Sequence, residues 1–471
     1  MTGGRVSFTP ERLLRALERC RVPAQDPSQS GYCLALSGGL DSSVLLACLA
    51  HLRDSGALLA PLRAVHVDHG LHADSARWSG HCRDFAAGRS VPLTSLRVDA
   101  GAAPGESPEA AARAARYAAL KGNLSAGEVL LTAHHADDQL ETILLQWLRG
   151  GGLQAVAGMR RLARFGPGWH ARPLLDVPRD GLRAWAVGQG IAWLDDPSNR
   201  DTRFDRNYLR LEVLPIVRAR WPAVARTAGR VADFAAEALE LEHEVAATDL
   251  RHVAEGAVLS LPRLTALADA RQRAVLRAWL RALSLPVPSA RTLEALRHDM
   301  SAAAADRIPM VRWPGAIVRR YRERLYAEVP VAGGLASGDW PVGVAAEWPL
   351  QQGARLELVA GTGRGLSRER LPAALQVTAR CEGAEYHPAD GAHRRPLRKW
   401  FQDHGVLPWR RDSIPLLCAD GEIVAIADIS CAAAYAARPD EPSWRVRWHG
   451  RPVVTEQEAL ALNWPEHPPI H

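Results

Sequence analysis

Apolar and polar positions follow two alternating patterns in the first part of the chain. Short apolar runs of strand length occur at residues 33–36, 63–67, 94–98 and 129–132. Between them, residues 43–52, 74–87 and 108–121 have apolar positions at helical spacing. This strand–helix alternation predicts an α/β fold with a doubly wound parallel sheet, in which ligands bind beyond the carboxyl ends of the strands.

The pattern changes after the first part of the chain. Two further helical stretches, 180–189 and 204–220, lead into a nearly all-helical region at 221–283, which contains a long amphipathic helix over 223–253. A Gly/Ala/Ser-rich linker at 332–339 precedes short strand-like runs at 355–359, 423–427 and 444–448. We therefore predict a catalytic α/β domain over residues 1–220, a helical domain over 221–335 and a small α+β domain over 345–450.

The charge and the cysteine content of the chain indicate which classes of ligand to expect. The 471 residues carry a formal net charge of +6, and the only lysines are Lys121 and Lys399. Codon bias explains arginine in place of lysine, but it does not explain the basic excess, which favours a polyanionic partner such as nucleic acid. The seven cysteines form no CxxC pair, which indicates reduced thiols and argues against zinc or iron–sulfur binding.

Nothing in the sequence indicates a membrane. No apolar run approaches the roughly 20 residues that a membrane-spanning helix needs. The N-terminal region lacks a basic-then-apolar signal segment, and residues 10–21 have the pattern of a charged amphipathic helix. We expect a cytoplasmic protein with no membrane partner.

A glycine-containing turn joins the first predicted strand to the first predicted helix. Its residues are Ser37, Gly38, Gly39, Leu40, Asp41 and Ser42. Unpaired backbone N–H groups and the positive end of the helix dipole meet there, and the glycines let the backbone approach a phosphate. The turn lacks the lysine of a Walker A loop. It resembles the pyrophosphate loop of the N-type ATP pyrophosphatases.

Two further motifs lie near the expected ligand crevice. His66-Val67-Asp68-His69-Gly70-Leu71 ends the second strand, and a capped turn with solvated histidines is the alternative interpretation. Arg113 and Arg116 are three positions apart and share one helical face. Their guanidinium groups suit a phosphate or a base edge, whereas a solvated helix face is the simpler alternative.

The segment His134-His135-Ala136-Asp137-Asp138-Gln139-Leu140-Glu141-Thr142 follows the fourth strand. Asp137 and Glu141 are four apart at the start of a helix, with Asp138 beside them. Such carboxylates suit Mg²⁺ or the ammonium group of an amine substrate. Their alternative role is to cap the helix N-terminus. Farther on, Arg206 and Arg210 share one face of a helix.

Together these motifs resemble the bacterial tRNA(Ile)-lysidine synthetases. The resemblance rests on SGGLDS, HVDHGL, ARAARY, HHADDQLET, RGGGL, RPLL, WLDDPSN and RNYLR, in that order, across residues 32–215. It returns at residues 394–417, RRPLRKWFQDHGVLPWRRDSIPLL. The chain departs from the family pattern after RGGGL and at residues 382–385, where the family usually has Gly-Gly-Glu.

The resemblance implies a ligase that uses ATP and Mg²⁺. The wobble cytidine of the isoleucine tRNA with anticodon CAU is adenylated, free L-lysine replaces AMP at C2, and the resulting lysidine changes the tRNA from methionine to isoleucine identity. The phosphate loop would hold ATP and Asp41 would hold Mg²⁺. Arg113 would hold the cytidine or the adenylate phosphate. Asp137, Asp138 and Glu141 would hold the lysine ammonium groups and Mg²⁺, with one of them or His134 as the proton acceptor.

The resemblance also implies tRNA contacts. The candidate residues are Arg116, Arg206, Arg210, Arg394, Arg395, Arg398, Lys399, Arg410 and Arg411. Those after Arg394 are interleaved with Trp400 and Trp409, and a solvated basic face is their alternative interpretation. Related enzymes are often dimers, although the sequence has no interface signature.

Two rival functions need different features. A tRNA-thiolating enzyme requires a thiolate carrier or a cluster, usually with CxxC pairs, and the chain has none. A non-catalytic RNA-binding protein on the same fold need not retain Asp41 or the carboxylates of HHADDQLET, and all of them are present. The sequence therefore favours the ligase.

Overall fold

The computed structural model describes residues 8–22, 31–68, 70, 75–99, 101, 108–196, 200–304, 307–330, 335, 337–343, 347–379, 384–391 and 393–462. The chain divides into two compact units, one up to Glu242 and one from His243 onward. The described cysteines form no disulfide. No described helix has both the length and the apolar character that crossing a bilayer requires.

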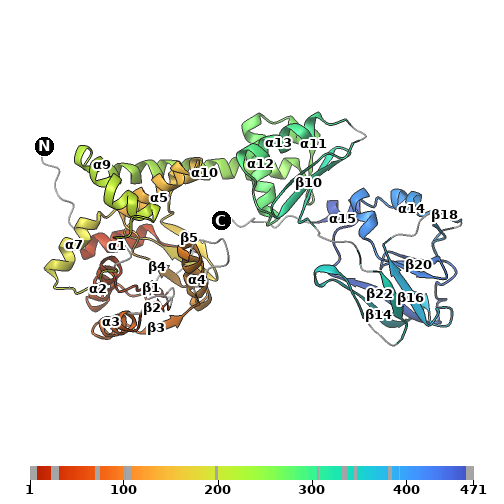
Figure 1. Ribbon diagram of the computed structural model, residues 1–471, viewed down its shortest axis with the longest axis horizontal. Helices are drawn as coiled ribbons and strands as arrows, with labels where there is room; N and C mark the ends of the chain where they lie inside the picture. The colour runs from red at the N-terminus through yellow and green to blue at the C-terminus, as the bar shows by residue number, and fades with distance from the viewer. Residues whose placement is uncertain are drawn as a thin grey trace. The chain divides into compact units, whose positions relative to one another are not determined.

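The first unit is built on a six-stranded sheet with the order β3-β2-β1-β4-β6-β5 (Figure 1). Its strands are β1 (Tyr32–Ala35), β2 (Leu62–Asp68), β3 (Leu93–Arg97), β4 (Val129–Leu131), β5 (Leu162–Phe165) and β6 (Gly168–Ala171). All neighbours are parallel except β5, which runs antiparallel to β6. The predicted doubly wound parallel sheet is confirmed, and its four predicted strands agree with the structure to within one residue at each end.

Helices connect and cover these strands. They are α1 (Pro10–Arg19), α2 (Leu40–Asp54), α3 (Ser75–Ala87), α4 (Pro108–Asn123), α5 (Ala136–Leu148), α6 (Leu153–Ala157), α7 (Arg179–Gly188), α8 (Asp205–Tyr208) and α9 (Leu214–Arg220). Helix α2 packs against β1, α1 and α7, which explains why Val44, Leu45 and Leu46, at successive positions around it, are all fully buried. The predicted helix over 204–220 is interrupted by a π-helical turn at Leu209–Val213. Pro215, in the first turn of α9, lacks the N–H that a continuous helix would use there.

The strand order places a topological switch beside β1. Strand β1 lies between β2 and β4, so the loops that follow β1 and β4 leave the sheet at adjacent carboxyl ends. Open parallel sheets bind ligands at such a point. The predicted phosphate loop follows β1, and His134 and His135 follow β4. The fold therefore brings the main sequence motifs to one edge of the sheet.

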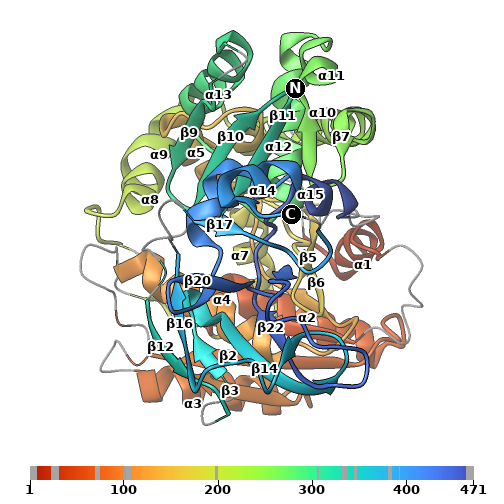
Figure 2. The same ribbon diagram turned by 90° about the vertical axis from the view of Figure 1, so that its right-hand side faces the viewer.

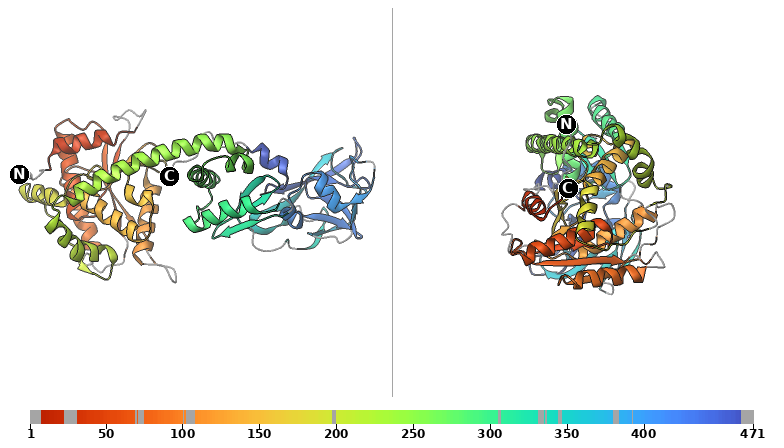
Figure 3. Two further views of the ribbon diagram at one scale, coloured as in Figure 1. Left: turned by 90° about the horizontal axis from the view of Figure 1, so that it is seen from above. Right: turned by 90° about the vertical axis from the view of Figure 1, so that its left-hand side faces the viewer.

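Helix α10 (Val224–Val253) is continuous, and the division between the two units falls inside it (Figure 3). A five-stranded antiparallel sheet follows, with the order β7-β8-β11-β10-β9. Its elements are β7 (Ala254–Glu255), β8 (Val258–Ser260), β9 (Met310–Trp313), β10 (Ala316–Tyr321) and β11 (Arg324–Glu328), with helices α11 (Leu261–Thr265), α12 (Asp269–Ala282) and α13 (Ala290–Ala302) around the buried Trp279. The sequence analysis predicted only helices in this region. The β10–β11 turn has Arg322 at φ +55°, without the glycine or asparagine that usually marks such a turn.

The remainder of the second unit has two antiparallel sheets, β12-β16-β19-β20-β21 and β13-β14-β22-β15 (Figure 2). Their strands are β12 (Gly338–Pro341), β13 (Glu347–Pro349), β14 (Arg355–Thr362), β15 (Leu366–Ser367), β16 (Ala374–Thr378), β19 (Leu416–Ala419), β20 (Glu422–Ile426), β21 (Ser430–Cys431) and β22 (Pro442–His449). A two-stranded sheet, β17 (Glu385–Tyr386) with β18 (Arg395–Pro396), and helices α14 (Leu397–Asp403) and α15 (Glu456–Ala461) complete it. Both larger sheets share one apolar core around Trp340 and Trp400. The predicted strand runs fall on β14, β20 and β22.

Candidate active site

The phosphate loop is a tight turn between β1 and α2. Gly38 has φ +81°, and a Cβ there would lie 3.0 Å from Sγ of Cys82, so both conformation and space require glycine. Gly39 is the N-cap of α2 and makes no side-chain cap hydrogen bond. The first backbone N–H groups of α2 therefore lack a side-chain cap and suit an anion at the positive end of the helix.

The serines of this loop hold its shape. The hydroxyls of Ser37 and Ser42 lie 3.0 Å apart, and the Ser42 hydroxyl donates to the carbonyl of Gly39 at 3.2 Å. The backbone N–H of Leu194 donates to the carbonyl of Gly38 at 2.9 Å, which ties the loop to the segment after α7. Both hydroxyls thus bond within the loop, and the helix N–H groups and Asp41 remain for a ligand.

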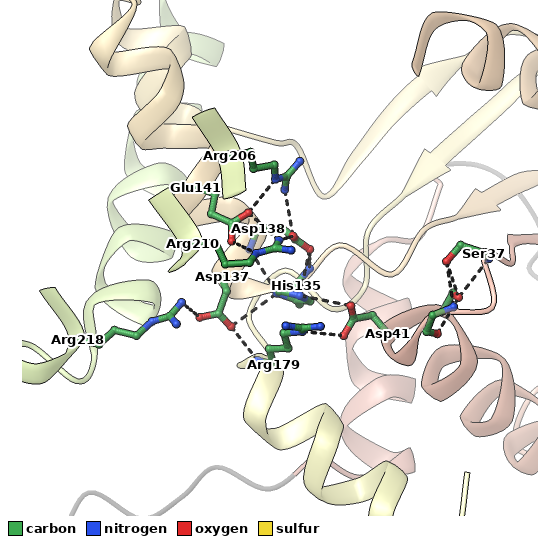
Figure 4. A network of polar contacts seen from close by, with 12 residues as sticks. Ser37, Asp41, His135, Asp137, Asp138, Glu141, Arg179, Arg206, Arg210 and Arg218 are labelled. Carbon is green, nitrogen blue, oxygen red and sulfur yellow. Dashed lines mark hydrogen bonds and ion pairs between the residues drawn. The ribbon is translucent and has the colours of Figure 1, made fainter. Parts of the chain in front are cut away.

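Asp41 lies in the first turn of α2, beside the loop (Figure 4). One carboxylate oxygen is 3.7 Å from Nε2 of His135, and the other is 3.8 Å from Nε of Arg179 and buried without a hydrogen bond. A buried carboxylate oxygen without a hydrogen bond, next to a phosphate loop, fits Mg²⁺, which proteins often bind with one or two carboxylates plus substrate phosphates. No three His, Cys, Asp or Glu side chains of the described residues form a metal site by themselves.

The carboxylate cluster comprises Asp137, Asp138 and Glu141 of α5. Two arginines form ion pairs with it (Figure 4). The side chain of Glu141 is fully buried and accepts hydrogen bonds from Nε of Arg206 at 2.8 Å and from Nε of Arg210 at 2.7 Å. Asp138 accepts from both guanidinium groups at 3.0 Å. The structure therefore brings the predicted carboxylates together, and it adds Arg206 and Arg210, which the sequence analysis had placed among the tRNA contacts.

The third carboxylate has partners of its own. Asp137 forms an ion pair with Arg218 and accepts the backbone N–H of Arg179 at 2.8 Å. Asp138 and His135 form a capping box at the start of α5, so the capping alternative is confirmed for Asp138. The sequence offered no signal for Arg179 or Arg218, because both become neighbours of α5 only through the fold.

His135 is buried among carboxylates. Its ring nitrogens lie 3.3 Å from Asp138, 3.7 Å from Asp41 and 3.7 Å from Asp137. Burial alone would lower the pKa of His135, but these carboxylates outweigh it and raise the pKa. Burial would raise the pKa of Asp138, whereas His135 and Arg206 lower it to about 2. Asp138 is therefore ionised at neutral pH.

A cationic cluster of Arg113, Arg116 and Arg172 gathers around Tyr117. The guanidinium carbons of Arg113 and Arg116 are 5.0 and 5.6 Å from the centre of the Tyr117 ring. Burial lowers the pKa of both Arg116 and Arg172. None of the three arginines has a carboxylate partner among the described residues. Such a concentration of uncompensated positive charge suits a phosphate, as predicted for Arg113.

His134 borders the cationic cluster. Its Nδ1 is 2.7 Å from Oγ1 of Thr132, which is 2.8 Å from Nε2 of His170. Nη2 of Arg172 is 3.1 Å from Nδ1 of His170. Burial, reinforced by nearby arginines, lowers the pKa of His134 to about 3 and that of His170 to about 2. The sequence analysis missed Thr132 and His170; a histidine within the short apolar stretch Trp169–Ala171 was the only available signal.

The predicted motif at residues 66–71 plays a structural part where it is described. The buried His66 donates from Nδ1 to the carbonyl of Leu36 at 2.9 Å. Asp68 accepts the backbone N–H of Gly70 at 2.9 Å, as in a capped turn. His69 and Leu71 lie outside the described residues, as do residues 197–199 of the WLDDPSN motif.

The predicted tRNA contacts of the second unit differ in whether they form an ion pair within the protein. Arg398 and Lys399, on α14, are exposed and have no ion-pair partner among the described residues. Arg394 pairs with Glu422 at 2.9 Å and Arg395 with Asp403 at 3.1 Å.

The remaining two candidates, Arg410 and Arg411, have partners within the second unit. Arg410 is buried and forms an ion pair with Glu328 of β11, while Arg411 donates to the carbonyl of Val406 at 3.2 Å. Trp400 is 1% exposed, and Trp409 packs edge-on against Tyr326. Trp400 therefore belongs to the apolar interior, and the partly buried Trp409 packs against a smaller apolar cluster.

Three known domain families match separate parts of the chain. The PP-loop domain matches residues 12–217, the TilS substrate binding domain matches residues 259–326, and the TilS substrate C-terminal domain matches residues 375–448. Among solved structures, a U34-tRNA thiolase from Methanococcus maripaludis aligns with a TM-score of 0.39 and 14% identity, over 47% of this chain and 78% of that one. That similarity is too low to bear on function.

Full-length relatives agree over most of the chain. It is 42% identical over 416 residues to the tRNA(Ile)-lysidine synthase of Alkalilimnicola ehrlichii, covering 87% of this chain and 92% of that protein. The enzymes of the same name from Methylococcus capsulatus and Coxiella burnetii are 38% and 34% identical, over 89% and 93% of this chain and 96% of each of those proteins. The chain belongs to the tRNA(Ile)-lysidine synthase family.

Proposed function

We propose that this protein joins free L-lysine to C2 of the wobble cytidine in the isoleucine tRNA with anticodon CAU. Its PP-loop domain uses ATP, and AMP and pyrophosphate are the expected by-products. One observation carries the proposal: the phosphate loop, the cationic cluster and the carboxylate cluster lie around the carboxyl ends of neighbouring strands. An anion site and an ammonium site in one crevice suit the joining of a nucleotide to an amine.

The first step is adenylation of the cytidine. The backbone N–H groups at the start of α2 hold the phosphates that leave. We assign to Arg113, supported by Arg116, the role of stabilising negative charge on the α-phosphate or of binding the base. Cytidine O2 attacks the α-phosphorus, and the bond from phosphorus to pyrophosphate breaks. The base must leave its stack to reach this site.

Asp41 is the proposed ligand of Mg²⁺. Its buried oxygen without a hydrogen bond and its position beside the loop support this role. Bound Mg²⁺ would neutralise charge on the departing pyrophosphate.

The second step needs lysine. The ε-amine attacks C2, the bond from C2 to O2 breaks, and AMP leaves with that oxygen. The carboxylates of Asp137, Asp138 and Glu141 suit the lysine ammonium groups, and one of them accepts the amine proton. Arg206 and Arg210, which neutralise these carboxylates, suit the α-carboxylate of the same zwitterion.

Binding of the tRNA outside the anticodon is assigned to the second unit. Arg398 and Lys399 are its best candidates among the predicted residues, because they are exposed on α14 and lack ion-pair partners among the described residues. Contacts of this kind supply salt-dependent affinity rather than sequence choice. The cytoplasmic location and the homodimer stay predictions.

Incorporation of labelled lysine tests the proposal. The substrates are a transcript of the CAU isoleucine tRNA, ATP and Mg²⁺, and the initiator methionine tRNA with the same anticodon is the control. We expect lysine in the first tRNA and not in the second. Pyrophosphate release without lysine incorporation would indicate a different nucleophile, and the absence of both would indicate an RNA-binding protein without this activity.

A further inference from the structure

The hydrogen bonds behind His134 have a fixed direction, which begins at Arg172. A guanidinium group has only N–H donors and stays protonated. Because Nη2 of Arg172 lies 3.1 Å from Nδ1 of His170, that nitrogen must accept. The neutral His170 ring therefore carries its proton on Nε2.

The same reasoning assigns donor and acceptor in the hydrogen bonds from His170 to Thr132 and from Thr132 to His134. Nε2–H of His170 donates to Oγ1 of Thr132 over 2.8 Å. The threonine hydroxyl has one proton, which it then donates to Nδ1 of His134 over 2.7 Å. Nδ1 of His134 is thus an acceptor, and the proton of its neutral ring is on Nε2.

Packing holds this chain of groups in place. Nη1 of Arg172 donates to the carbonyl of Arg160 at 2.8 Å, so the guanidinium is anchored independently of His170. The rings of Tyr117 and Phe165 lie 6.0 and 5.6 Å from that of His170. Thr132 and His170 are both buried. Protonation of either histidine would place a second positive charge next to Arg172 in a buried site, which supports the neutral state of both rings.

We propose that Arg172, His170 and Thr132 are positioning residues that hold His134 in its Nε2–H tautomer, so that His134 donates a hydrogen bond to the substrate and does not act as a base. Nε2 of His134 makes no hydrogen bond to any described residue, which leaves it for a ligand. In the proposed reaction, on which this part rests, the acceptor is O2 of the adenylated cytidine, the oxygen that leaves with AMP. A neutral imidazole donor stabilises negative charge there without transferring a proton. The amine proton then goes to the carboxylate cluster.

Two substitutions at Thr132 separate this role from packing. Thr132→Val keeps the volume and removes the hydroxyl, whereas Thr132→Ser keeps the hydroxyl. We expect lysine transfer to slow by about 10- to 100-fold in the valine variant, with the KM for ATP unchanged, and to recover in the serine variant. Phe165→Leu is the matched control, because it thins the packing against His170 and leaves the four polar groups intact.

The ring-nitrogen NMR shifts of ¹⁵N-histidine protein give a direct readout without substrate. The His134 signals are identified by their loss in His134→Gln. We expect the Nε2–H pattern in the wild type, Thr132→Ser and Phe165→Leu, and loss of the single tautomer in Thr132→Val. A wild-type proton on Nδ1, or normal lysine transfer by Thr132→Val, would overturn the proposal. Absence of lysine transfer by the wild type would overturn the proposed reaction, and the tautomer would still be decided by NMR.

Discussion

His134 and His135 are neighbours in the chain and lie in opposite environments. His134 borders the cationic cluster, and burial with nearby arginines lowers its pKa to about 3. His135 lies within 4 Å of three carboxylates, which outweigh burial and raise its pKa. Two identical residues side by side in a motif therefore need not have the same role. His134 is the proposed neutral donor, and His135 belongs to the carboxylate side.

The backbone explains the difference. His135 is in extended conformation, with φ −119° and ψ −179°, before α5 begins. Successive side chains of extended backbone point to opposite sides. His134 therefore faces Thr132 and β6, while His135 faces Asp41 and the first turn of α5. The start of α5 thus separates the cationic cluster, which we propose to serve phosphates, from the carboxylate cluster, which we propose to serve an amine.

Removing the carboxylate next to the phosphate loop has the largest expected effect. Asp41→Asn removes the proposed Mg²⁺ ligand, and we expect tRNA-dependent pyrophosphate release to fall by about 10²- to 10³-fold. Affinity for tRNA, measured by filter binding, should stay unchanged. Asp54→Asn, at the other end of α2, is the control with the same charge change. A normal rate in Asp41→Asn would remove Asp41 from the catalytic account.

Breaking the carboxylate cluster comes next. Glu141→Gln removes the fully buried one of the two carboxylates that pair with Arg206 and Arg210 and leaves them Asp138, and we expect a loss of about 3 kcal/mol in the free energy of unfolding. Urea denaturation measures it, with the exposed Glu212→Gln as control. Unchanged stability would show that the ion pairs with Arg206 and Arg210 are dispensable for the fold.

The contributions of His170 and His135 to the free energy of unfolding should depend on pH with opposite sign. The pKa of His170 is lowered to about 2, so below about pH 6.5 the unfolded chain binds a proton that the folded protein does not. Stability is therefore lost as the pH falls from 6.5. His170→Gln should reduce that loss by up to about 1.4 kcal/mol per pH unit. The raised pKa of His135 has the opposite sign: its contribution is present at low pH and is lost as the pH rises above 6.5.

Urea unfolding at several pH values between 4.5 and 6.5 measures the acid limb. His298→Gln, at an exposed histidine, is the control. If the free energy of unfolding of His170→Gln had the wild-type dependence on pH, His170 would take up a proton in the folded protein. The proposed hydrogen-bond chain from Arg172 to His134, which needs a neutral His170, would then be wrong.

The smallest expected effect lies at the exposed cations of α14. Substituting Arg398 and Lys399 with alanine should weaken tRNA binding several-fold and reduce the salt slope by about 2. Arg394→Ala should change the slope less, since Arg394 already pairs with Glu422. Equal slopes in the wild type and the double variant would make this a solvated face only.

Much of the first unit could be predicted from the sequence, because its strands are apolar runs and its motifs follow them directly. The phosphate loop is contiguous, so its chemistry is visible in the chain. The hydrogen-bond chain behind His134 is not visible in the sequence, because Thr132 and His170 are 38 residues apart and meet only through the pairing of β4 with β6. Arg206 and Arg210 likewise read as a basic face until the fold sets them on Asp138 and Glu141. In the second unit, the β10–β11 turn lacks the usual residues, so its strands were missed.

We propose that one side of the site adenylates the cytidine and that the other delivers lysine. Transfer of label from α-³²P-ATP to tRNA in a single turnover measures the two steps separately. Arg113→Ala should leave the tRNA unlabelled. Asp137→Asn should label it at the wild-type rate and then keep the label when lysine is added, because the amine is no longer held. Loss of labelling in both variants, or release of the label by lysine in Asp137→Asn at the wild-type rate, would contradict the division of the crevice into two sides.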